Sequence, residues 1–389
     1  MTRSTPKLVR RLAVALLVAV FAWVLARTFV GRVYPVGSSS MEPTIHGSPE
    51  QVFVRYDRGF RPQRYDLVVL RAPAPESAIV VKRVVGLPGE LLLISGGDLL
   101  IEGRRLGLDV LRPPPIPVFD SRIASFSDAF LAPSVPFEAR GSGWRLDARG
   151  KRGNLTFSRR ATDDHLDAQN ALVPGSQEVN DLRIDGVFEL RGSGKLTLRI
   201  TEEGDAFELE LELVVDVLER ASLLRHAGNA EATVLGQLTR PAGDRSANSC
   251  SVSFENVDNQ LIAEIAGQFL VAGYEANTPL FGVVNEDDRH LQPRLNVGAS
   301  DIEVVIEHLT VARDLYYTGD GSVGTGSPAA LGPDGIFVLG DNSADSRDSR
   351  VFGPVRLDGL EGRATHVVWP LKAARRLGGL RTLVPPATR

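Results

Sequence analysis

The sequence predicts a mainly β protein, and two patterns carry this prediction. Between about residues 118 and 318, apolar and polar residues alternate in several stretches, of which 207–213 is the clearest. Alternation with period two is typical of half-buried antiparallel strands, so this region is expected to form a β-sandwich. Between residues 51 and 110, short apolar and β-branched runs are separated by glycine and proline, which predicts further short strands joined by tight turns.

Composition limits the classes of protein that this chain can belong to. Its 389 residues suffice for two or three domains, and its 43% hydrophobic content suffices for a packed core. The formal net charge of -4 argues against a nucleic-acid partner. Cys250 is the only cysteine, so no intrachain disulfide is possible, and it is expected to be a buried or inert thiol.

The N-terminal segment has the pattern of a membrane anchor. Four basic residues within residues 1–11 precede an apolar run from Leu12 to Ala26. Extended to residue 30, with Arg27 reaching the interface, the run is long enough to cross a bilayer. The basic cluster then predicts that residues 1–11 are cytoplasmic and that the chain after residue 31 is external. A cleavable signal peptide, with Val24 and Ala26 before the cut, is the alternative that composition leaves open.

The remaining chain divides at two stretches of unusual composition. The proline-rich run 112–117 cannot be helix or central strand, and 319–327 has the composition of a flexible Gly/Ser linker. We therefore expect an anchor at 12–30, one domain formed by two parts, 31–111 and 331–370, and a sandwich with linkers at 112–330 inserted between them. Strands are expected at 335–339 and 364–369, and 371–389 is a basic tail, either loose or in contact with anionic lipid headgroups.

The residues that could take part in catalysis lie in three segments: 37–44, 82–90 and 340–350. A serine hydroxyl is a poor nucleophile until a base takes its proton. None of the six histidines has a typical catalytic setting, and His46, although near Ser40, has no identifiable supporting acid. Lysine is the alternative base. Period two places Val80, Lys82 and Val84 on one face of a strand, where burial is expected to lower the lysine pKa by ~2–3 units.

The order and wording of these segments are similar to those of type I signal peptidases, the leader peptidases of bacterial membranes. The resemblance implies that Ser40 in Ser-Met-Glu-Pro-Thr is the nucleophile and that Lys82 in Lys-Arg-Val-Val-Gly-Leu-Pro-Gly is the general base. It also implies that the Ser38 hydroxyl joins the Ser40 amide in an oxyanion hole. Ser346 falls where the family has a serine that orients the lysine amine.

Further positions follow from the same resemblance, which covers roughly residues 8–111 and 331–370. Structural residues near the site are expected at Asp341 and at an ion pair between Asp348 and Arg350. Family pockets accept small side chains one and three residues before the cut, and the matching apolar positions are Val36, Met41, Ile45 and Val81. Gly37 stands where many members have proline, and the stretch from 112 to 330 is far larger than the usual insertion. Its closing strand, 309–317, resembles those of concanavalin-like jelly rolls.

The resemblance therefore implies a membrane-bound serine endopeptidase that removes N-terminal signal peptides from exported precursors. Its site would lie on the extracytoplasmic side of the bacterial plasma (inner) membrane, its partners would be those precursors and the lipid bilayer, and no metal, cofactor or nucleic acid is implied. One rival is an exported binding protein whose sandwich is the working part and which needs neither Ser40 nor Lys82. A second, a self-cleaving repressor-like protease, is disfavoured because a membrane-like segment stands where a DNA-binding motif is expected.

Overall fold

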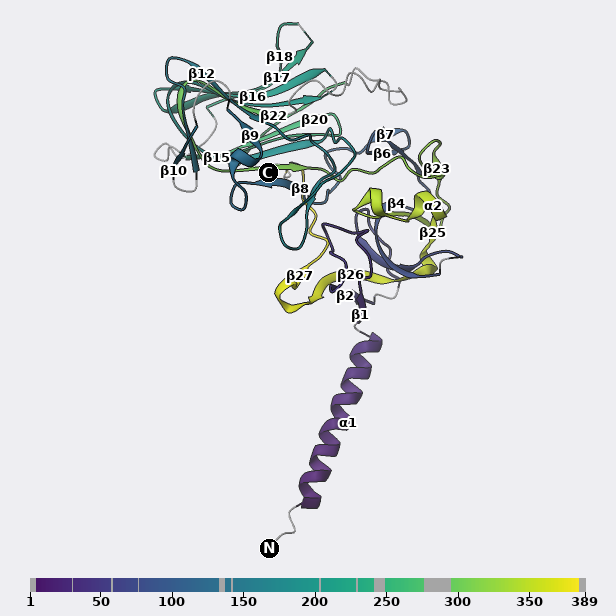
Figure 1. Cartoon of the computed structure of the whole chain (residues 1–389). Coiled ribbons are helices and arrows are strands. Elements are labelled where there is room, and N and C mark those ends of the chain that lie inside the picture. The colour runs from purple at the N-terminus through teal and green to yellow at the C-terminus, as the bar shows by residue number, and fades with distance from the viewer. Residues whose placement is uncertain are drawn as a thin grey trace. The chain divides into compact units, whose positions relative to one another are not determined.

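The computed structural model consists mainly of antiparallel strands, with one long helix at the N-terminus (Figure 1). It describes residues 5–29, 31–56, 59–75, 77–132, 137–140, 143–202, 204–228, 230–240, 249–275 and 295–384. Two compact units are formed: unit 1 contains residues 1–93, 101–103 and 320–379, and unit 2 contains residues 94–100, 104–319 and 380–389. The chain is thus mainly β, as the two sequence patterns predict.

The N-terminal helix, α1, spans Thr5–Phe29. It begins at a threonine followed by Pro6, which is tolerated in a first turn because its missing amide proton needs no partner there. The large apolar side chains between Val9 and Phe21 are at least half exposed. Among the residues searched, which are those the structure describes, no helix combines the length and apolarity needed to cross a membrane. Residues 1–4 and Val30, which belong to the predicted cytoplasmic end and anchor, lie outside the described residues.

Unit 1 contains an antiparallel sheet of eight strands, in the order β1-β2-β26-β3-β4-β24-β25, with β27 paired to β26. The strands are β1 (Gly31–Pro35), β2 (Gln51–Arg55), β3 (Leu67–Arg71), β4 (Ile79–Gly86), β24 (Gly335–Leu339), β25 (Val355–Arg356), β26 (Leu360–Trp369) and β27 (Arg375–Arg376). A one-turn helix, α2 (Ser349–Phe352), and short 3-10 helices at Ser343–Asp345, Leu357–Gly359 and Leu371–Ala373 complete it. Because β24 pairs with β4, the third sequence segment lies beside the second.

The central strands of unit 1 are buried on both faces, which explains their continuous apolar sequences. In β3, Leu67 and Val69 pack into one cluster, while Val68 and Leu70 pack into a second. Lys82 in β4 is opposite Val68. A lysine at this position is removed from solvent, and burial disfavours the charged form of its amine.

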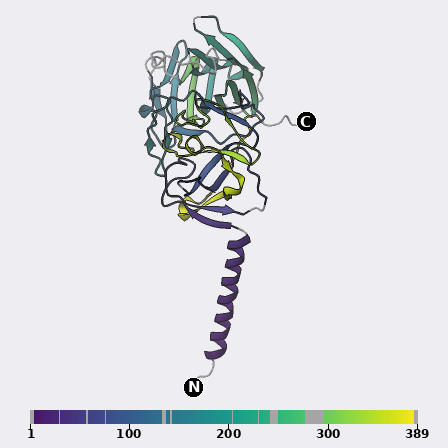
Figure 2. The same cartoon turned by 90° about the vertical axis from the view of Figure 1, so that its right-hand side faces the viewer.

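Unit 2 is a larger antiparallel assembly built around two long strands, β15 (Leu182–Glu202) and β22 (Leu295–Arg313), which pair with each other along most of their length. The others are β8 (Ile116–Asp120), β9 (Phe130–Leu131), β10 (Phe137–Arg140), β11 (Gly143–Asp147), β12 (Arg152–Phe157), β16 (Asp205–Val214), β17 (Val217–Ala227), β18 (Thr233–Thr239), β19 (Ser249–Val257), β20 (Gln260–Ile265) and β21 (Gln268–Gly273). Figure 2 shows these strands turned by 90°.

The long strands change partners along their length, which gives unit 2 its sandwich-like form. The first part of β15 pairs with β19, and its second part pairs with β16 after an irregularity near Gly192. The alternating segment 207–213 lies within β16, and its apolar residues are buried in the core of unit 2 while its acidic residues are partly exposed. The period-two pattern in the sequence therefore corresponds to strands with one covered face.

Smaller elements complete the fold. A four-stranded sheet has the order β23-β5-β6-β7 and comprises β5 (Leu91–Ser95), β6 (Asp98–Ile101), β7 (Arg104–Arg105) and β23 (Ala329–Ala330). A two-stranded sheet joins β13 (His165–Leu166) to β14 (Leu172–Val173), and a 3-10 helix spans Phe126–Asp128. The last two residues of the proline run, which was predicted to avoid central strands, lie in β8, and among the described strands β8 pairs only with β22.

Two segments are more ordered than their composition indicated. In the predicted flexible linker, the amides of Ser322 and Val323 both donate to the carbonyl of Arg350, at 2.9 and 3.1 Å. In the predicted tail, Arg381 is bound to Glu255 of unit 2, so a loose tail is wrong for this part. Composition did not indicate this order because the residues that bind these segments, Arg350 and Glu255, are distant from them in the sequence. Residues 385–389 of the tail lie outside the described residues, and the predicted boundaries at 112 and 330 stay predictions.

Candidate active site

The loop between β1 and β2 carries Ser40, and its neighbours fix its place. The side chains of Met41 and Ile45 are buried in the core of unit 1, and the amide of Ile45 donates to the carbonyl of Met41 at 2.9 Å. The amide of Asn342, in the third segment, donates to the carbonyl of Ser40 at 3.1 Å. Ser40 is 7% exposed. The first and third segments are therefore joined through the backbone at this serine.

Lys82 brings all three segments together. Its Nζ donates to Ser40 Oγ at 2.7 Å and to Ser346 Oγ at 3.1 Å. The residue is 2% exposed. Val80 and Val84, its period-two neighbours on β4, pack into the same apolar cluster, as the strand pattern predicted. A lysine amine thus lies within hydrogen-bonding distance of two serine hydroxyls in a largely dry setting.

The burial of Lys82 changes its acidity. Desolvation, the largest cause, lowers the pKa of Lys82 from 10.5 to about 8. The carboxylates of Asp348 and Asp341 oppose this change, and the guanidinium of Arg350 adds to it. About a tenth of the amines are then neutral at pH 7, a far larger fraction than for a lysine in water. A neutral amine is able to accept a proton from the adjacent hydroxyl.

Ser346 is oriented by a buried ion pair. Its hydroxyl donates its only proton to Asp348 Oδ2 at 2.6 Å, so its oxygen accepts from Lys82. Asp348 in turn binds Arg350, with Nε to Oδ1 at 2.9 Å and Nη2 to Oδ2 at 2.8 Å. Both members of the pair are at most 1% exposed. The ion pair expected between Asp348 and Arg350 is present, and it fixes the direction of the Ser346 hydroxyl.

Asp341 holds a second buried cation. It accepts two hydrogen bonds from Arg83, at 2.7 Å from Nε and 2.6 Å from Nη2, and one from the Thr44 hydroxyl. The sequence pointed to Asp341 but not to these partners. Arg83 follows Lys82 on β4, and Thr44 follows Ser40 by four residues. This contact therefore ties the same three segments together a second time.

Ser38 lies beside Ser40 on the same loop. Its hydroxyl donates to Ser40 Oγ at 3.2 Å, and the residue is exposed. In the part of the chain that the structure describes, the Ser40 amide has no acceptor. Two hydrogen-bond donors therefore lie close to the hydroxyl oxygen that Lys82 contacts.

Gly340 is a site residue that the sequence reasoning missed. A Cβ placed on it would lie 2.2 Å from Ser346 Oγ and 2.4 Å from the Ser40 carbonyl, closer than real contacts allow. Its amide also donates to Asp348 Oδ2 at 3.0 Å. Only glycine lets the third segment approach so closely. A glycine next to an aspartate in a motif is the only signal that the sequence offered.

The four predicted pocket positions lie together but differ in accessibility. Val36, Met41, Ile45 and Val81 all belong to one apolar cluster of unit 1. Ile45 is fully buried and Met41 is 1% exposed, whereas Val36 and Val81 retain 6% and 8%. Their assignment to a substrate pocket stays a prediction, and in this structure they form part of the core.

Other reactive residues make different contacts. The Nδ1 atom of His46 lies 4.0 Å from a carboxylate oxygen of Glu42, and its amide donates to Glu50. Burial raises the pKa of the Cys250 thiol, which disfavours the reactive thiolate. Cys250 therefore has the properties of the inert thiol that the sequence indicated.

Among the described residues, one group of acidic side chains has the spacing of metal ligands. Carboxylate oxygens of Asp98, Asp181 and Asp258 in unit 2 lie within 4.8 Å of one another. Arg105 binds Asp98 at 2.7 Å and Arg112 binds Asp258 at 2.5 Å, so two of the three already have a cationic partner. Burial and the neighbouring Asp258 raise the pKa of Asp98 to about 7. The two arginines, together with protons bound by the carboxylates, can therefore neutralise the negative charge of this cluster.

Comparison with known proteins finds a family similarity in two separate segments of the chain. The family model described as signal peptidase, peptidase S26, matches residues 9–124 and 302–369. Signal peptidase I P of Bacillus subtilis subsp. natto is 34% identical over 101 residues, which are 25% of this chain and 53% of the relative. Signal peptidase I of Bacillus amyloliquefaciens is 37% identical over 98 residues, 24% of this chain and 50% of the relative. The chain thus spans about half the length of the curated relatives it matches.

Among solved structures, a carbohydrate binding module, CBM66 from Bacillus subtilis, is 9% identical with a TM-score of 0.32, and covers 47% of this chain and 95% of the module. The family matches contain the loop with Ser40, the strand with Lys82 and the segment with Ser346. They flank the long stretch from which most of unit 2 is built. The two matched segments are therefore similar to the signal peptidase family, peptidase S26, and a β region that the family model does not match separates them.

Proposed function

We propose that this protein is a serine endopeptidase that removes N-terminal signal peptides from exported precursor proteins, with Ser40 as nucleophile and Lys82 as general base. The observation that carries the proposal is the 2.7 Å contact between Lys82 Nζ and Ser40 Oγ, in a setting where burial lowers the pKa of the amine to about 8. A Ser/Lys pair of this kind can form an acyl-enzyme without histidine or metal.

The proposed reaction begins with a neutral Lys82. The amine takes the proton of Ser40 as Oγ attacks the scissile carbonyl carbon, which forms a tetrahedral intermediate. The ammonium then gives that proton to the leaving amine, and the C–N bond breaks to leave an acyl-enzyme on Ser40. Water, deprotonated by the same amine, releases the signal peptide and restores the serine. Ser346 keeps the amine directed at Ser40, since Asp348 fixes its hydroxyl.

Stabilisation of the oxyanion is assigned to two donors. The Ser40 amide has no acceptor among the described residues, so it is free to bind developing negative charge. The Ser38 hydroxyl, 3.2 Å from Ser40 Oγ, is near enough to turn from the nucleophile to the carbonyl oxygen as the bond forms. Donors arranged before the reaction stabilise such charge strongly in a site with little water.

Cleavage after small residues is proposed from the four apolar positions. Val36 and Val81 each keep some exposure beside the site, so they are the members best able to contact a substrate side chain. Met41 and Ile45, whose side chains are in the core, would then contribute indirectly by fixing the position of the Ser40 loop. A shallow apolar surface of this kind favours alanine over large side chains one and three residues before the cut.

We further propose that α1 attaches unit 1 to a lipid bilayer, with its basic beginning on the cytoplasmic side. The apolar side chains between Val9 and Phe21 are at least half exposed, and such a surface favours a lipid environment. Arg10 and Arg11 near its start match the sign bias of cytoplasmic flanks. The catalytic unit would then lie on the extracytoplasmic side of the bacterial plasma membrane, where exported precursors emerge.

Precursor cleavage by the purified full chain in detergent tests the endopeptidase proposal. Ser40→Ala is expected to lose detectable turnover, while Ser39→Ala, which removes the neighbouring hydroxyl, is expected to keep most of it. Both should melt near the wild-type temperature, because each substitution removes one oxygen. Equal activity of Ser40→Ala and the wild type would refute the assignment of the nucleophile, and an inactive wild type would refute the substrate class.

A further inference from the structure

Ser40 lies in the loop between β1 and β2, and Glu50 closes the end of this loop. The amide of Val36, directly after β1, donates to the Glu50 carbonyl at 3.0 Å. The Glu50 side chain lies back along the loop, where it accepts from the amide of His46 at 2.9 Å. Glu50 is 4% exposed. A carboxylate buried in this way needs a cationic partner, because its charge has lost contact with water.

The cationic partner comes from a segment that is remote in the sequence. Arg375, in β27, donates from Nη1 to Glu50 Oε1 at 2.6 Å and from Nη2 to Glu50 Oε2 at 3.0 Å. Its Nη2 also donates to the carbonyl of Thr44 at 2.9 Å. A guanidinium has the planar fork of donors that such a contact with three acceptors needs, whereas an ammonium is a point charge. Arg375 therefore binds the loop at two positions, one before and one after His46.

Packing fixes the segment that carries Arg375. β27 pairs with β26, so the backbone of Arg375 is part of the sheet of unit 1. Two residues further on, Leu377 is 7% exposed and belongs to the same apolar cluster as Met41 and Ile45, which follow Ser40 in the loop. The arginine is therefore supported by a paired strand and by the same core as the loop that it binds.

Thr44 is held on two sides within this loop. Its hydroxyl donates to Asp341 of the third segment, while its carbonyl accepts from Arg375. It follows Ser40 by four residues. Misplacement of a reacting group by about 1 Å lowers rates by roughly 10²-fold, so the position of this loop determines how fast Ser40 can react.

We propose that Arg375 is a positioning residue that holds the loop of Ser40 in place for the reaction. It acts through Glu50 and the carbonyl of Thr44 rather than on a reacting atom. The proposal rests on the proposed function, since it needs Ser40 to be the nucleophile. The matched family segments end at residue 369, so the family similarity gives Arg375 no role.

The test compares Arg375→Gln with Arg363→Gln in the purified full chain in detergent. Arg363 is the matched control, because it is also a partly exposed arginine of unit 1 that binds a buried carboxylate. Its partner, Asp66, lies directly before β3 instead of in the Ser40 loop. Precursor cleavage gives kcat and KM, and thermal melts report folding. Hydrogen exchange followed by mass spectrometry reports the order of residues 36–50 and requires no activity.

Arg375→Gln is expected to lower kcat at least about tenfold and to change KM less than about twofold, because the nucleophile moves while the substrate contacts stay. Amides of residues 36–50 should exchange faster than in the wild type. Arg363→Gln should keep kcat within about twofold of the wild type, with unchanged exchange in the loop. Arg375→Lys, which keeps the charge but not the fork, should recover part of kcat.

Equal kcat for folded Arg375→Gln and Arg363→Gln would overturn the proposal, and so would wild-type exchange of residues 36–50 in Arg375→Gln. If Arg375→Gln does not fold, Arg375→Lys takes its place, and a full wild-type kcat in that variant would overturn the proposal. A wild type that cleaves no precursor would refute the proposed function instead. Hydrogen exchange in the same samples then still decides whether Arg375 holds the loop.

Discussion

At the scale of single residues, the site depends on one amine whose surroundings disfavour its charged form. Lys82 is charged in water at neutral pH, but burial in unit 1 lowers its pKa to about 8. The same burial makes the folded state less stable whenever the amine carries a proton. Chemistry and stability are therefore opposed at this residue, as is common at active sites.

Lys82→Met is expected to raise stability while abolishing activity. The folded pKa lies below the unfolded value of 10.5, so the unfolded state binds more protons between about pH 8 and pH 10.5, and wild-type stability rises with pH across that window. At pH 7 the variant should be more stable by about 1–3 kcal/mol, because lost hydrogen bonds offset part of the gain. Denaturant unfolding at pH 7 and at about pH 10 measures this.

The advantage of Lys82→Met should shrink at about pH 10, where the wild-type amine is neutral in the folded state and no buried charge remains to be relieved. Lys195→Met is the matched control, since Lys195 is 43% exposed and lies in unit 2. A variant that is less stable than the wild type at both pH values would show that burial of the Lys82 amine does not lower the free energy of unfolding.

Gly340→Ala is expected to disturb the site without touching a reacting atom. The new methyl group would displace Ser346 Oγ and the Ser40 carbonyl, which lie 2.2 and 2.4 Å from its position. Misplacement by about 1 Å lowers rates by roughly 10²-fold. Cleavage kinetics of Gly340→Ala and Gly332→Ala test this, because a Cβ on Gly332 meets nothing within 4 Å. Similar rates for the two variants would show that the close approach is unimportant.

Much of this site could be predicted from the sequence, because its three segments match sequence motifs of a known family. Ser40, Lys82, Ser346 and the partners Asp348 and Arg350 meet as the motifs suggested. Other contacts depend on how distant segments pack, which local sequence does not encode. Examples are the pairing of Arg83 with Asp341 and the space that Gly340 leaves.

At the scale of elements, strand patterns were the most predictable feature and strand ends the least. The segment 335–339 was expected as a strand and is one. Strands β15 and β22 are longer than any stretch the alternation marked, since each continues through a bulge while its partners change. The tail was misjudged because Arg381 has its partner, Glu255, more than a hundred residues away.

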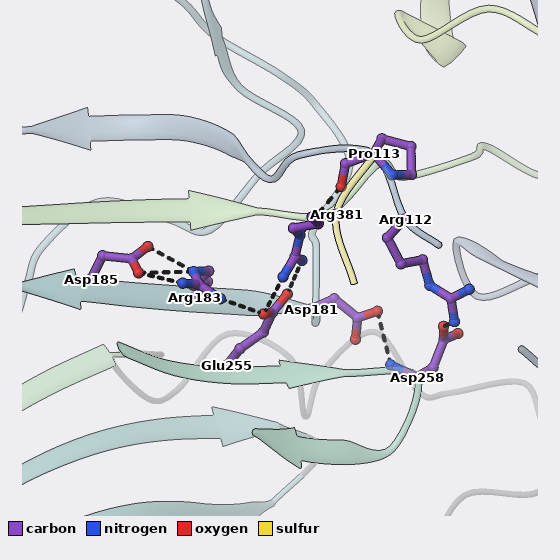
Figure 3. A network of polar contacts seen from close by, with 8 residues as sticks. All are labelled: Arg112, Pro113, Asp181, Arg183, Asp185, Glu255, Asp258 and Arg381. Carbon is purple, nitrogen blue, oxygen red and sulfur yellow. Dashed lines mark hydrogen bonds and ion pairs between the residues drawn. The ribbon is translucent and has the colours of Figure 1, made fainter. Parts of the chain in front are cut away.

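Figure 3 shows the charged network that holds this tail segment. Glu255 is 2% exposed and accepts from Arg381 and Arg183, each at 2.8 Å. Burial opposes ionisation of Glu255, but Arg381 and then Arg183 outweigh it and keep the pKa below its usual range. Close by, Arg112 binds Asp258, whose amide donates to Asp181. The network attaches the segment after residue 380 to the core of unit 2.

Arg381→Ala is expected to destabilise unit 2 by about 2–4 kcal/mol, because it leaves a buried carboxylate with one cation fewer. Arg356→Ala, which removes an arginine from a pair whose side chains are both 70% exposed, should leave stability nearly unchanged, because solvent screens such a pair. Urea unfolding followed by circular dichroism compares the two. Equal stabilities would mean that the segment after residue 380 is not attached to unit 2 in solution.

At the scale of the whole molecule, the proposed function requires a peptidase unit, to which a β unit is added, and attachment of α1 to lipid. Topology is the prediction that belongs here. If α1 inserts with its basic end in the cytoplasm, protease added to intact spheroplasts should digest the chain after residue 31 and spare a cytoplasmic control protein. Survival of that region, while an exported control is cut, would rule out the arrangement.

The central claim is that neutral Lys82 activates Ser40, and the pH dependence of precursor cleavage tests it most directly. For the wild type, kcat/KM should rise about tenfold per pH unit up to about pH 8 and then level off, since only the deprotonated amine accepts the proton. Lys82→Arg should be as inactive as Ser40→Ala at every pH, because guanidinium does not deprotonate, whereas Lys195→Arg should follow the wild-type profile. Substantial turnover by folded Lys82→Arg, or a wild-type profile that is flat from about pH 6 to about pH 9, would contradict the account.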